Sequence, residues 1–401
     1  MAEPPMRSAQ GFGSGREHLL APPRAATGRL CRVRFQILDI IFNPPHPVTG
    51  RIVSPADRLE RVVETAVLAE QLGIDSYSVG ERHAGEVLSS SPTVVLGAIA
   101  QATDRILLST GVTVLSVLDP VRVAEDLCTV DQLSRGGRLE IVIGKGNEVL
   151  QYPLFGLDIG KQYDYLTENY ELLRTLLREE HVDWAGAHRP VLTDVTTLPR
   201  PFSGPFRIWH GSATSASAVD LAAKWGDPIV TANALQPPRE NYKVLIDRYR
   251  EQYAAHGHDP AKAFVGSGSG GLFLADTTEQ AIEEYRPIYE GIVRQADQRK
   301  HDPVAVGKVT SFRTIEDAVE RGPALVGSPP ERVAEKIVDY HESFGHVLQS
   351  VSINHVLDFE RQKDTLRRFA EEVIPLVRAE LPPTTLWSEA DTDRAKGFTA
   401  A

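Results

Sequence analysis

Cysteine is scarce in this sequence, with only Cys31 and Cys128 among 401 residues. Two cysteines cannot build a disulfide framework or a cysteine-rich metal site, and their scarcity suits a reducing, cytoplasmic compartment. The sequence also lacks a run of about 18 apolar residues, which argues against a membrane-spanning helix. Basic residues are fewer than acidic ones as well, because the chain has 43 Lys+Arg and 54 Asp+Glu, which gives a net charge of −11. That balance argues against a protein that binds nucleic acid by neutralising phosphates.

The two ends of the chain differ in composition from its middle. Residues 1–31 are rich in Gly, Pro, Ala and Arg, but they lack the apolar stretch of about 7–15 residues that a secretory signal needs. We therefore expect a disordered extension at 1–31 and a polar tail at 382–401. An apolar content of 42% over the whole chain is enough for a large core.

Strand-like and helix-like patterns alternate through residues 32–381. Two helix starts are marked clearly, since Ser54-Pro55 and Asp119-Pro120 each place a capping residue before a proline. Strands separated by helices imply a parallel sheet with crossover connections. Eight strands are expected, at Arg34–Ile40, Ser76–Val79, Ile106–Leu115, Leu139–Ile143, Arg207–Trp209, Pro228–Thr231, Ala263–Leu274 and Ser350–His355.

Eight such units fit one (β/α)8 TIM barrel spanning 32–381. An open doubly wound sheet is the competitor, but the segment Asn43–Pro47 (NPPHP) after the first strand cannot cradle a pyrophosphate. A minimal barrel needs about 250 residues. We assign the excess to the two tails, to an inserted β-hairpin near 181–206, and to an irregular polar loop near 295–326 that could serve as a lid.

Two motif matches fail in their context. Gly266–Gly271 fits G-x-G-x-x-G, but strand-like residues follow it where a nucleotide site needs a helix. A strand that something approaches closely is the better interpretation. His341 and His346 are five residues apart, whereas zinc ligands on one helical face are four apart, so we expect no metal there.

Two loops after expected strands suit an anion. The segment Gly211–Ser215 (GSATS) joins a strand to a helix, and its small residues and hydroxyls would lie at the positive helix end. A well-capped turn explains it equally well. In the segment Gly144–Asn147 (GKGN), Lys145 could meet a phosphate with a point charge, although a solvated lysine in a glycine turn is the simpler interpretation.

Two further segments could carry chemistry. Glu81-Arg82-His83 follows the second strand, at the end of a barrel where catalytic residues gather, and a histidine there can exchange a proton near neutral pH. A loop histidine bonded to the backbone is the alternative. Gly111-Val112-Thr113 would pass close beneath a bound ring, or it is an ordinary barrel strand.

Together these residues resemble the bacterial luciferase-like flavin monooxygenases over roughly Arg34 to Arg378. The order and spacing of the pieces carry the resemblance, because no single piece is specific. The matching pieces are Val79–His83, Ser91–Thr93, Ala98–Ala100, Thr110–Leu115, Asp119–Asp126, Leu133–Glu140, Gly144–Gly146, Trp209–Ser212, Leu325–Pro329 and Ala370–Pro375.

The resemblance implies a barrel that binds FMN at the carboxyl ends of its strands. The family's Glu-His-His motif maps its second histidine to His83 and places Arg82 where the first histidine stands. His83 and Arg82 would then orient or protonate the oxygen species. A non-proline cis peptide is implied near Val112-Thr113. The implied cofactor-binding residues are Val112, Thr113, Lys145, Gly146, Asn147, Gly211, Ser212, Ala213 and Thr214.

The implied activity is that of an FMN-dependent monooxygenase, in which reduced flavin activates O2 and a small organic substrate is oxygenated. A separate NAD(P)H–flavin reductase could supply the reduced FMN, and the resemblance implies a homodimer. Three alternatives stay open. They are a hydride-transfer enzyme using a deazaflavin coenzyme, a non-catalytic flavin-binding protein, and a barrel hydrolase using carboxylates such as Asp39 and Glu81.

Overall fold

The computed structural model describes residues 33–83, 85–202, 204, 206–211, 215–232, 240–299, 312–321, 329–352 and 354–381. Its main sheet closes on itself in the order β3-β2-β1-β11-β10-β9-β8-β5, with β3 pairing back to β5 and β4 lying beside β5. All of these pairings are parallel. The strands are β1 (Arg34–Asp39), β2 (Ser76–Val79), β3 (Leu107–Thr110), β4 (Thr113–Val114), β5 (Leu139–Gly144), β8 (Arg207–His210), β9 (Ile229–Thr231), β10 (Val265–Gly271) and β11 (Leu348–Ser352).

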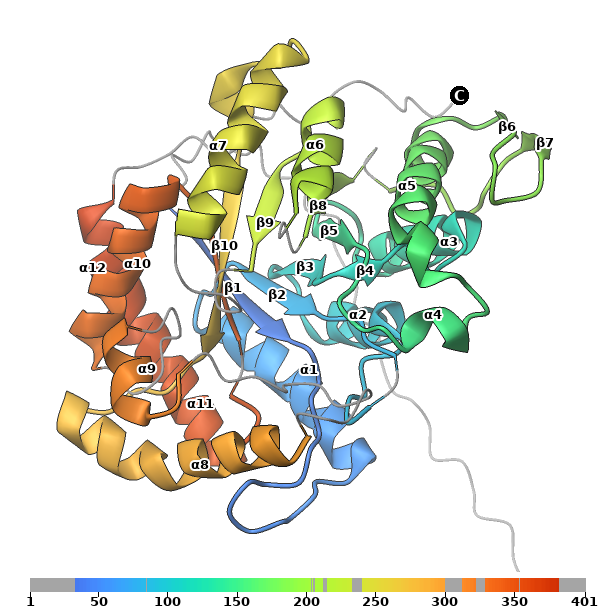
Figure 1. Cartoon of the computed structure of the whole chain (residues 1–401). Coiled ribbons are helices and arrows are strands. Elements are labelled where there is room, and N and C mark those ends of the chain that lie inside the picture. The colour runs from blue at the N-terminus through green and yellow to red at the C-terminus, as the bar shows by residue number, and fades with distance from the viewer. Residues whose placement is uncertain are drawn as a thin grey trace, which may run out of the picture.

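Helices surround this barrel, as Figure 1 shows. The expected caps are present, since Ser54 Oγ accepts a hydrogen bond from the Asp57 amide and Asp119 accepts from the amides of Val121 and Arg122. The helices are α1 (Pro55–Gln71), α2 (Pro92–Ala102), α3 (Pro120–Leu133), α4 (Gln151–Leu154), α5 (Gln162–Arg178), α6 (Ala216–Trp225), α7 (Glu240–Ala255), α8 (Thr278–Arg299), α9 (Ile315–Arg321), α10 (Pro330–Phe344), α11 (Phe359–Arg368) and α12 (Ile374–Glu380).

The (β/α)8 barrel expected from the sequence is confirmed, with differences at particular elements. The third strand is interrupted between β3 and β4, and β11 ends three residues before the expected limit at His355. The prediction of an irregular loop over 295–326 is wrong where α8 continues to Arg299 and where α9 forms. Helix α9 exists because Ile315, Ala318 and Val319 are buried. Residues 300–311 and 322–326 of that segment, and both predicted tails, lie outside the described residues.

The hairpin expected near 181–206 is present as β6 (Val182–Trp184) and β7 (Leu192–Val195), which pair antiparallel. It is tied to α5 through Glu168, whose carboxylate accepts hydrogen bonds from the backbone amides of Ala187, His188 and Arg189. Backbone amides that would otherwise face solvent therefore fix the insertion against the barrel wall.

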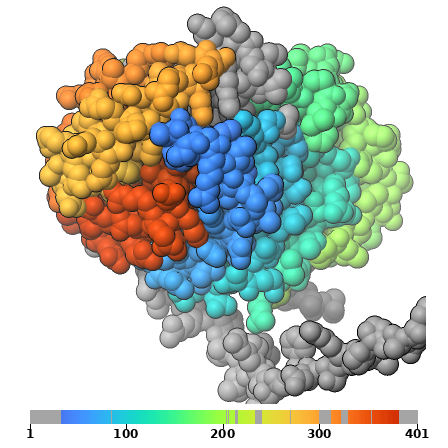
Figure 2. Space-filling view, turned by 90° about the horizontal axis from the view of Figure 1, so that it is seen from below, coloured from blue at the N-terminus to red at the C-terminus, as the bar shows by residue number. Residues whose placement is uncertain are grey.

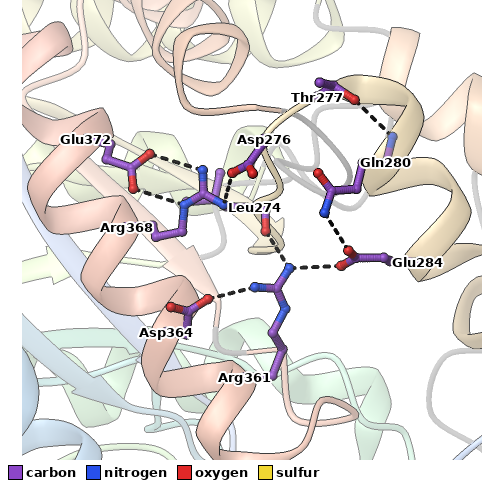
Figure 3. A network of polar contacts seen from close by, with 9 residues as sticks. All are labelled: Leu274, Asp276, Thr277, Gln280, Glu284, Arg361, Asp364, Arg368 and Glu372. Atoms are coloured by element: carbon purple, nitrogen blue, oxygen red, sulfur yellow. Dashed lines mark hydrogen bonds and ion pairs between the residues drawn. The ribbon is translucent and has the colours of Figure 1, made fainter.

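Helix α8 is held in place by contacts in both of its halves. Near its start, Arg361 donates to the Leu274 carbonyl at 2.8 Å and lies 3.1 Å from Glu284, while Arg368 lies 3.1 Å from Asp276. Figure 3 shows both arginines reaching from α11 toward the loop that leads into α8. This network joins the two helices.

The other half of α8 packs on the loop after β1. A Cβ on Gly291 would lie 2.7 Å from the Pro47 carbonyl oxygen, so only glycine allows this approach. Gln295 also donates to the Pro45 carbonyl at 3.3 Å. In Figure 2 the blue loop after β1 lies beside the yellow and orange atoms of α8. Helix α8 thus forms part of the rim at the carboxyl end of the barrel.

A buried charge cluster lies at the opposite, amino end of the strands. Glu140 accepts from Arg34 at 2.8 Å, from Arg207 at 2.5 Å and from the Trp209 indole at 3.2 Å. Burial alone would raise the pKa of Glu140, but the two arginines outweigh it and lower the pKa to about 2. The cluster joins β1, β5 and β8.

In the part of the chain described, no helix is long and apolar enough to cross a membrane.

We predict that Glu140→Gln lowers the free energy of unfolding by about 3–5 kcal/mol at pH 7, because two buried guanidinium groups lose their carboxylate. The folded-state pKa lies below the ordinary 4.5, so this stabilisation is present above pH 4.5 and is lost as the pH falls toward 2. Urea unfolding of the wild-type protein and the Glu140→Gln variant between pH 7 and pH 3 should show that the difference between their free energies of unfolding decreases. The control Glu125→Gln, at an exposed pair with Arg122, should change stability by less than about 0.5 kcal/mol.

Candidate active site at the carboxyl ends of the strands

The strand ends meet around the break in the third strand. The peptide bond between Gly111 and Val112 is cis, one bond earlier than the position near Val112-Thr113 that the sequence led us to expect. A Cβ on Gly211 would lie 2.5 Å from Val112 Cγ1, and one on Gly144 would lie 3.1 Å from Val112 Cγ2. The Val112 side chain is therefore seated against glycines at the ends of β5 and β8.

Gly111 itself packs against residues of two neighbouring strands, β1 and β2. A Cβ there would come within 2.7 Å of Leu38 Cδ1 and would collide with the Ser78 hydroxyl. The next residue but one, Thr113, is buried, and its Oγ1 has no hydrogen-bond partner in the described structure. These glycines and the unpartnered Thr113 hydroxyl together form a closely packed floor at the strand ends, and the hydroxyl is available to a bound polar group.

The residues after β2 form a fixed acid–histidine pair. His83 Nε2 lies 2.7 Å from Glu81 Oε1, and Glu81 Oε2 accepts from the Val114 amide at 3.0 Å. Glu81 therefore ties the end of β2 to β4 and sets the orientation of the imidazole. The Phe155 ring packs on His83 nearly perpendicular to the imidazole, with the ring centroids 4.7 Å apart. Sequence reasoning missed Phe155, which follows the short helix α4.

The carboxylates considered for a hydrolase are both engaged. Asp39 accepts from Arg58 at 2.6 Å, from the Ile41 amide at 2.7 Å and from the Tyr77 hydroxyl at 3.3 Å. Glu81 is held by His83 and β4, as described above. A pair of carboxylates free to act as acid and base is therefore missing at these two positions.

Arg82 reaches across the same end of the barrel. Its Nη2 donates to Asn147 Oδ1, in the loop after β5, and its guanidinium lies 5.6 Å from the centroid of the Phe42 ring, in the loop after β1. Burial lowers the pKa of Arg82 from its ordinary value, and Glu148 offsets part of that effect. Three loops thus converge on one guanidinium group.

The loop containing Lys145 is fixed by hydrogen bonds to its backbone. The Lys145 carbonyl accepts from Ser116 at 3.0 Å, from Gln151 at 2.9 Å and from Tyr152 at 3.0 Å. The following Gly146 has φ +69°, a conformation that favours glycine. The Lys145 ammonium is left bonded to the Gly146 carbonyl at 3.2 Å. The lysine is thereby positioned without a carboxylate partner among the described residues.

Tyr163 links this lysine to the next loop and was not found from the sequence. Its ring centroid lies 5.8 Å from Lys145 Nζ, and its hydroxyl donates to Ser215 Oγ at 2.9 Å. Ser215 is the N-cap of α6. Tyr163 therefore contacts both Lys145 and the N-terminus of α6, two positive groups of the kind that bind an anion. Ser212, Ala213 and Thr214 lie outside the described residues.

The structure describes both segments whose motif matches fail in the sequence. Gly266–Gly271 lies within β10 and opens no helix. His341 and His346 make a contact of their own, since His341 Nδ1 lies 2.7 Å from the His346 carbonyl oxygen. Within the described ranges, no three His, Cys, Asp or Glu side chains come together in a way that could hold a metal ion.

We predict that Gly211→Ala destabilises the protein by about 1–3 kcal/mol, because the added methyl group overlaps Val112 and Val142. The matched control is Gly97→Ala within α2, where the nearest atom, on Leu133, is 3.5 Å away. That change should be neutral or stabilising by up to about 1 kcal/mol. Thermal unfolding measures both, and equal effects of the two substitutions would contradict the tight packing at Gly211.

Curated relatives of this chain include several monooxygenases. It is 26% identical over 360 residues to the 4-hydroxyprotoasukamycin monooxygenase of Streptomyces nodosus subsp. asukaensis, covering 86% of this chain and 93% of the relative. It is 27% identical over 228 residues to the alkanal monooxygenase alpha chain of the Kryptophanaron alfredi symbiont, covering 57% of this chain and 61% of that one.

Solved structures share the fold. A monooxygenase from Streptomyces bottropensis matches with a TM-score of 0.71 at 24% identity, over 85% of this chain and 99% of that one. The oxygenating constituent of 3,6-diketocamphane monooxygenase from a Pseudomonas putida plasmid, in complex with FMN, matches with a TM-score of 0.67 at 20% identity, over 86% of this chain and 98% of that one. An F420-dependent secondary alcohol dehydrogenase matches with a TM-score of 0.65 at 19% identity, over 86% of this chain and 99% of that one.

The family model for luciferase-like monooxygenases matches residues 33–346. That span contains the barrel strands from β1 to β10 and the loops that converge on Val112 and Arg82. The chain therefore belongs to the luciferase-like monooxygenase family, and it is an oxidoreductase of that family.

Proposed function

We propose that this protein is an FMN-dependent monooxygenase that oxygenates a small organic substrate. The observation that carries the proposal is the glycine-lined floor around Val112 with the unpartnered Thr113 hydroxyl. The FMN complex of the diketocamphane monooxygenase, which shares this barrel, supports the choice of cofactor. When bound in its reduced form, FMN would supply the electrons that activate O2.

Two groups of residues would hold the cofactor. Val112 and Thr113 would lie against its ring, and Lys145 would face its phosphate from one side. The N-terminus of α6 would face the phosphate from the other side, and Tyr163 would keep the two apart at a fixed spacing. The remaining proposed binding residues are Gly146, Asn147, Gly211, Ser212, Ala213 and Thr214.

His83 and Arg82 are the proposed catalytic residues. Because Nε2 of His83 is bonded to Glu81, its Nδ1 is left to exchange a proton with a bound group. Arg82 keeps its proton and acts as a hydrogen-bond donor. The apolar ring of Phe155 covers one edge of the imidazole and limits the access of water.

A deazaflavin-dependent hydride transfer is the second candidate, because a neighbour of similar TM-score is the F420-dependent alcohol dehydrogenase. Titration of the purified protein with FMN and with F420 separates the two. We further propose a homodimer, a separate flavin reductase as the source of reduced FMN, and a cytoplasmic location.

For phosphate recognition, we predict that the wild-type protein binds FMN more tightly than riboflavin. Lys145→Met should weaken FMN binding about 10- to 100-fold, because a hydrogen bond to a charged group contributes about 1.5–3 kcal/mol, and should leave riboflavin binding unchanged. The control Lys161→Met alters an exposed lysine of the same loop and should change neither affinity. Flavin fluorescence titration measures the affinities of the wild-type protein and of both variants for FMN and for riboflavin. Failure of both FMN and F420 to bind would contradict the proposed function.

For proton transfer, we predict that His83→Gln lowers oxygenation about 100-fold or more while FMN affinity stays within twofold of wild type. Reduced FMN from a flavin reductase, 18O2 and a panel of aldehydes and ketones provide the assay, with 18O in the product as the readout. Wild-type protein that binds FMN but labels no substrate would favour a flavin-binding protein instead.

A further inference from the structure

We propose that Arg82 binds an acidic oxygen of the organic substrate, such as a carboxylate or an enolate, and that the rest of that substrate is apolar. The inference rests on the proposed function, because it places the substrate at the mouth that the FMN site shares. It assigns to Arg82 the recognition of the substrate in addition to the supply of a hydrogen bond.

Arg82 differs from the other buried arginines in its partners. Arg58, Arg82 and Arg138 are each no more than 9% exposed. Arg58 is paired with the Asp39 carboxylate at 2.6 Å and also donates to the Phe42 carbonyl. Arg138 donates to the carbonyls of Ser134, Ile106 and Ala100 and to the Thr103 hydroxyl. Arg82 has a single acceptor in the described structure, the amide oxygen of Asn147.

A guanidinium group has five N–H donors, and burying such a charge without hydrogen-bond acceptors is unfavourable. Four of the five donors of Arg82 have no acceptor among the described residues. Because guanidinium and carboxylate match in shape, an oxygen anion can take two of those donors at once. An arginine in this state fits the recognition of an anion better than a purely structural role.

The two side chains that contact the guanidinium group are accessible to solvent. Asn147 is exposed and Phe42 is half-buried, so Arg82 lies near the surface at the carboxyl end of the barrel. Arg82 also joins the loops after β1 and β5, on either side of its own strand in the barrel order. A ligand bound between these loops would meet the N–H groups that have no acceptor among the described residues.

Two other charged groups face this place. Glu148 is buried and raises the pKa of Arg82, but its carboxylate makes no ion pair with Arg82, and its Oε1 accepts from the Leu150 amide at 3.4 Å. Glu81 is held by His83 and Val114. Neither carboxylate fills the open donors, although Glu148 would weaken the attraction for a second anion.

The segments after β5 and β1 carry exposed apolar side chains. Val149, Leu154 of α4 and Phe155 are exposed, between 42% and 61%. Val48 and Ile52 in the loop after β1 are exposed to 52% and 60%. Exposed large hydrophobic side chains on the same two segments that contact Arg82 suit an apolar ligand. The substrate class that fits both features is an apolar molecule with one ionised oxygen.

The test uses FMN-loaded protein and two probes of the same shape, 2-naphthoate and 2-naphthamide, measured by calorimetry. We expect the wild-type protein to bind the carboxylate at least 10-fold more tightly than the amide, and Arg82→Met to remove that ratio. Dimedone, a cyclic 1,3-diketone that ionises to an enolate, separates the enolate source from the carboxylate source. Arg51→Met, which alters an exposed arginine in the loop after β1, is the matched control and should keep the wild-type ratio.

Arg82→Lys keeps the charge without the planar pair of donors, so it should keep a reduced preference for the carboxylate. This variant decides the question if Arg82→Met does not fold. Equal affinity of wild-type protein for naphthoate and naphthamide, with no binding of dimedone, would overturn the inference, as would an unchanged ratio in both Arg82 variants. If FMN does not bind at all, the proposed function fails, and the same ratio measured on the FMN-free protein still decides the role of Arg82.

Discussion

The close approach of three strand ends is the constraint on which the rest of the site depends. Gly144 and Gly211 leave room for the side chain of Val112, and Gly111 leaves room for Leu38 and Ser78 of the neighbouring strands. A methyl group at Gly111 or Gly211 would push neighbouring strands apart, since close-packed interiors cannot absorb it without movement. The positions of the loops after β2, β5 and β8 all follow from this contact.

The two ends of the barrel differ in how their charged groups are paired. At the amino end, Glu140 pairs with two arginines and joins three strands, which contributes stability. At the carboxyl end, Asp39 and Arg58 also form a buried ion pair, but Arg82 and Lys145 have few acceptors and no carboxylate within ion-pair distance in the described structure. This contrast agrees with the general rule that barrel enzymes place stability at one end and chemistry at the other.

Much of the fold could be predicted from the sequence because its signals are local. The caps at Ser54 and Asp119 and the alternating apolar strands depend on neighbouring residues. The break after Gly111 could not be read, because it depends on Ser78 and Leu38 from other strands. Tyr163, Phe155 and the bond from Glu81 to Val114 were missed for the same reason, since each acts through a residue distant in sequence. Helix α9 was missed because its burial depends on contacts far along the chain.

The contacts of α8 connect the outer surface of the barrel to its rim. Arg361 and Arg368 join α8 to α11 on the outer surface, while Gly291 packs the same helix against Pro47 at the rim. Glu284 and Asp276, which pair with these two arginines, are accessible to solvent. Charge changes at these two surface positions therefore act on a helix that also contacts the loop after β1.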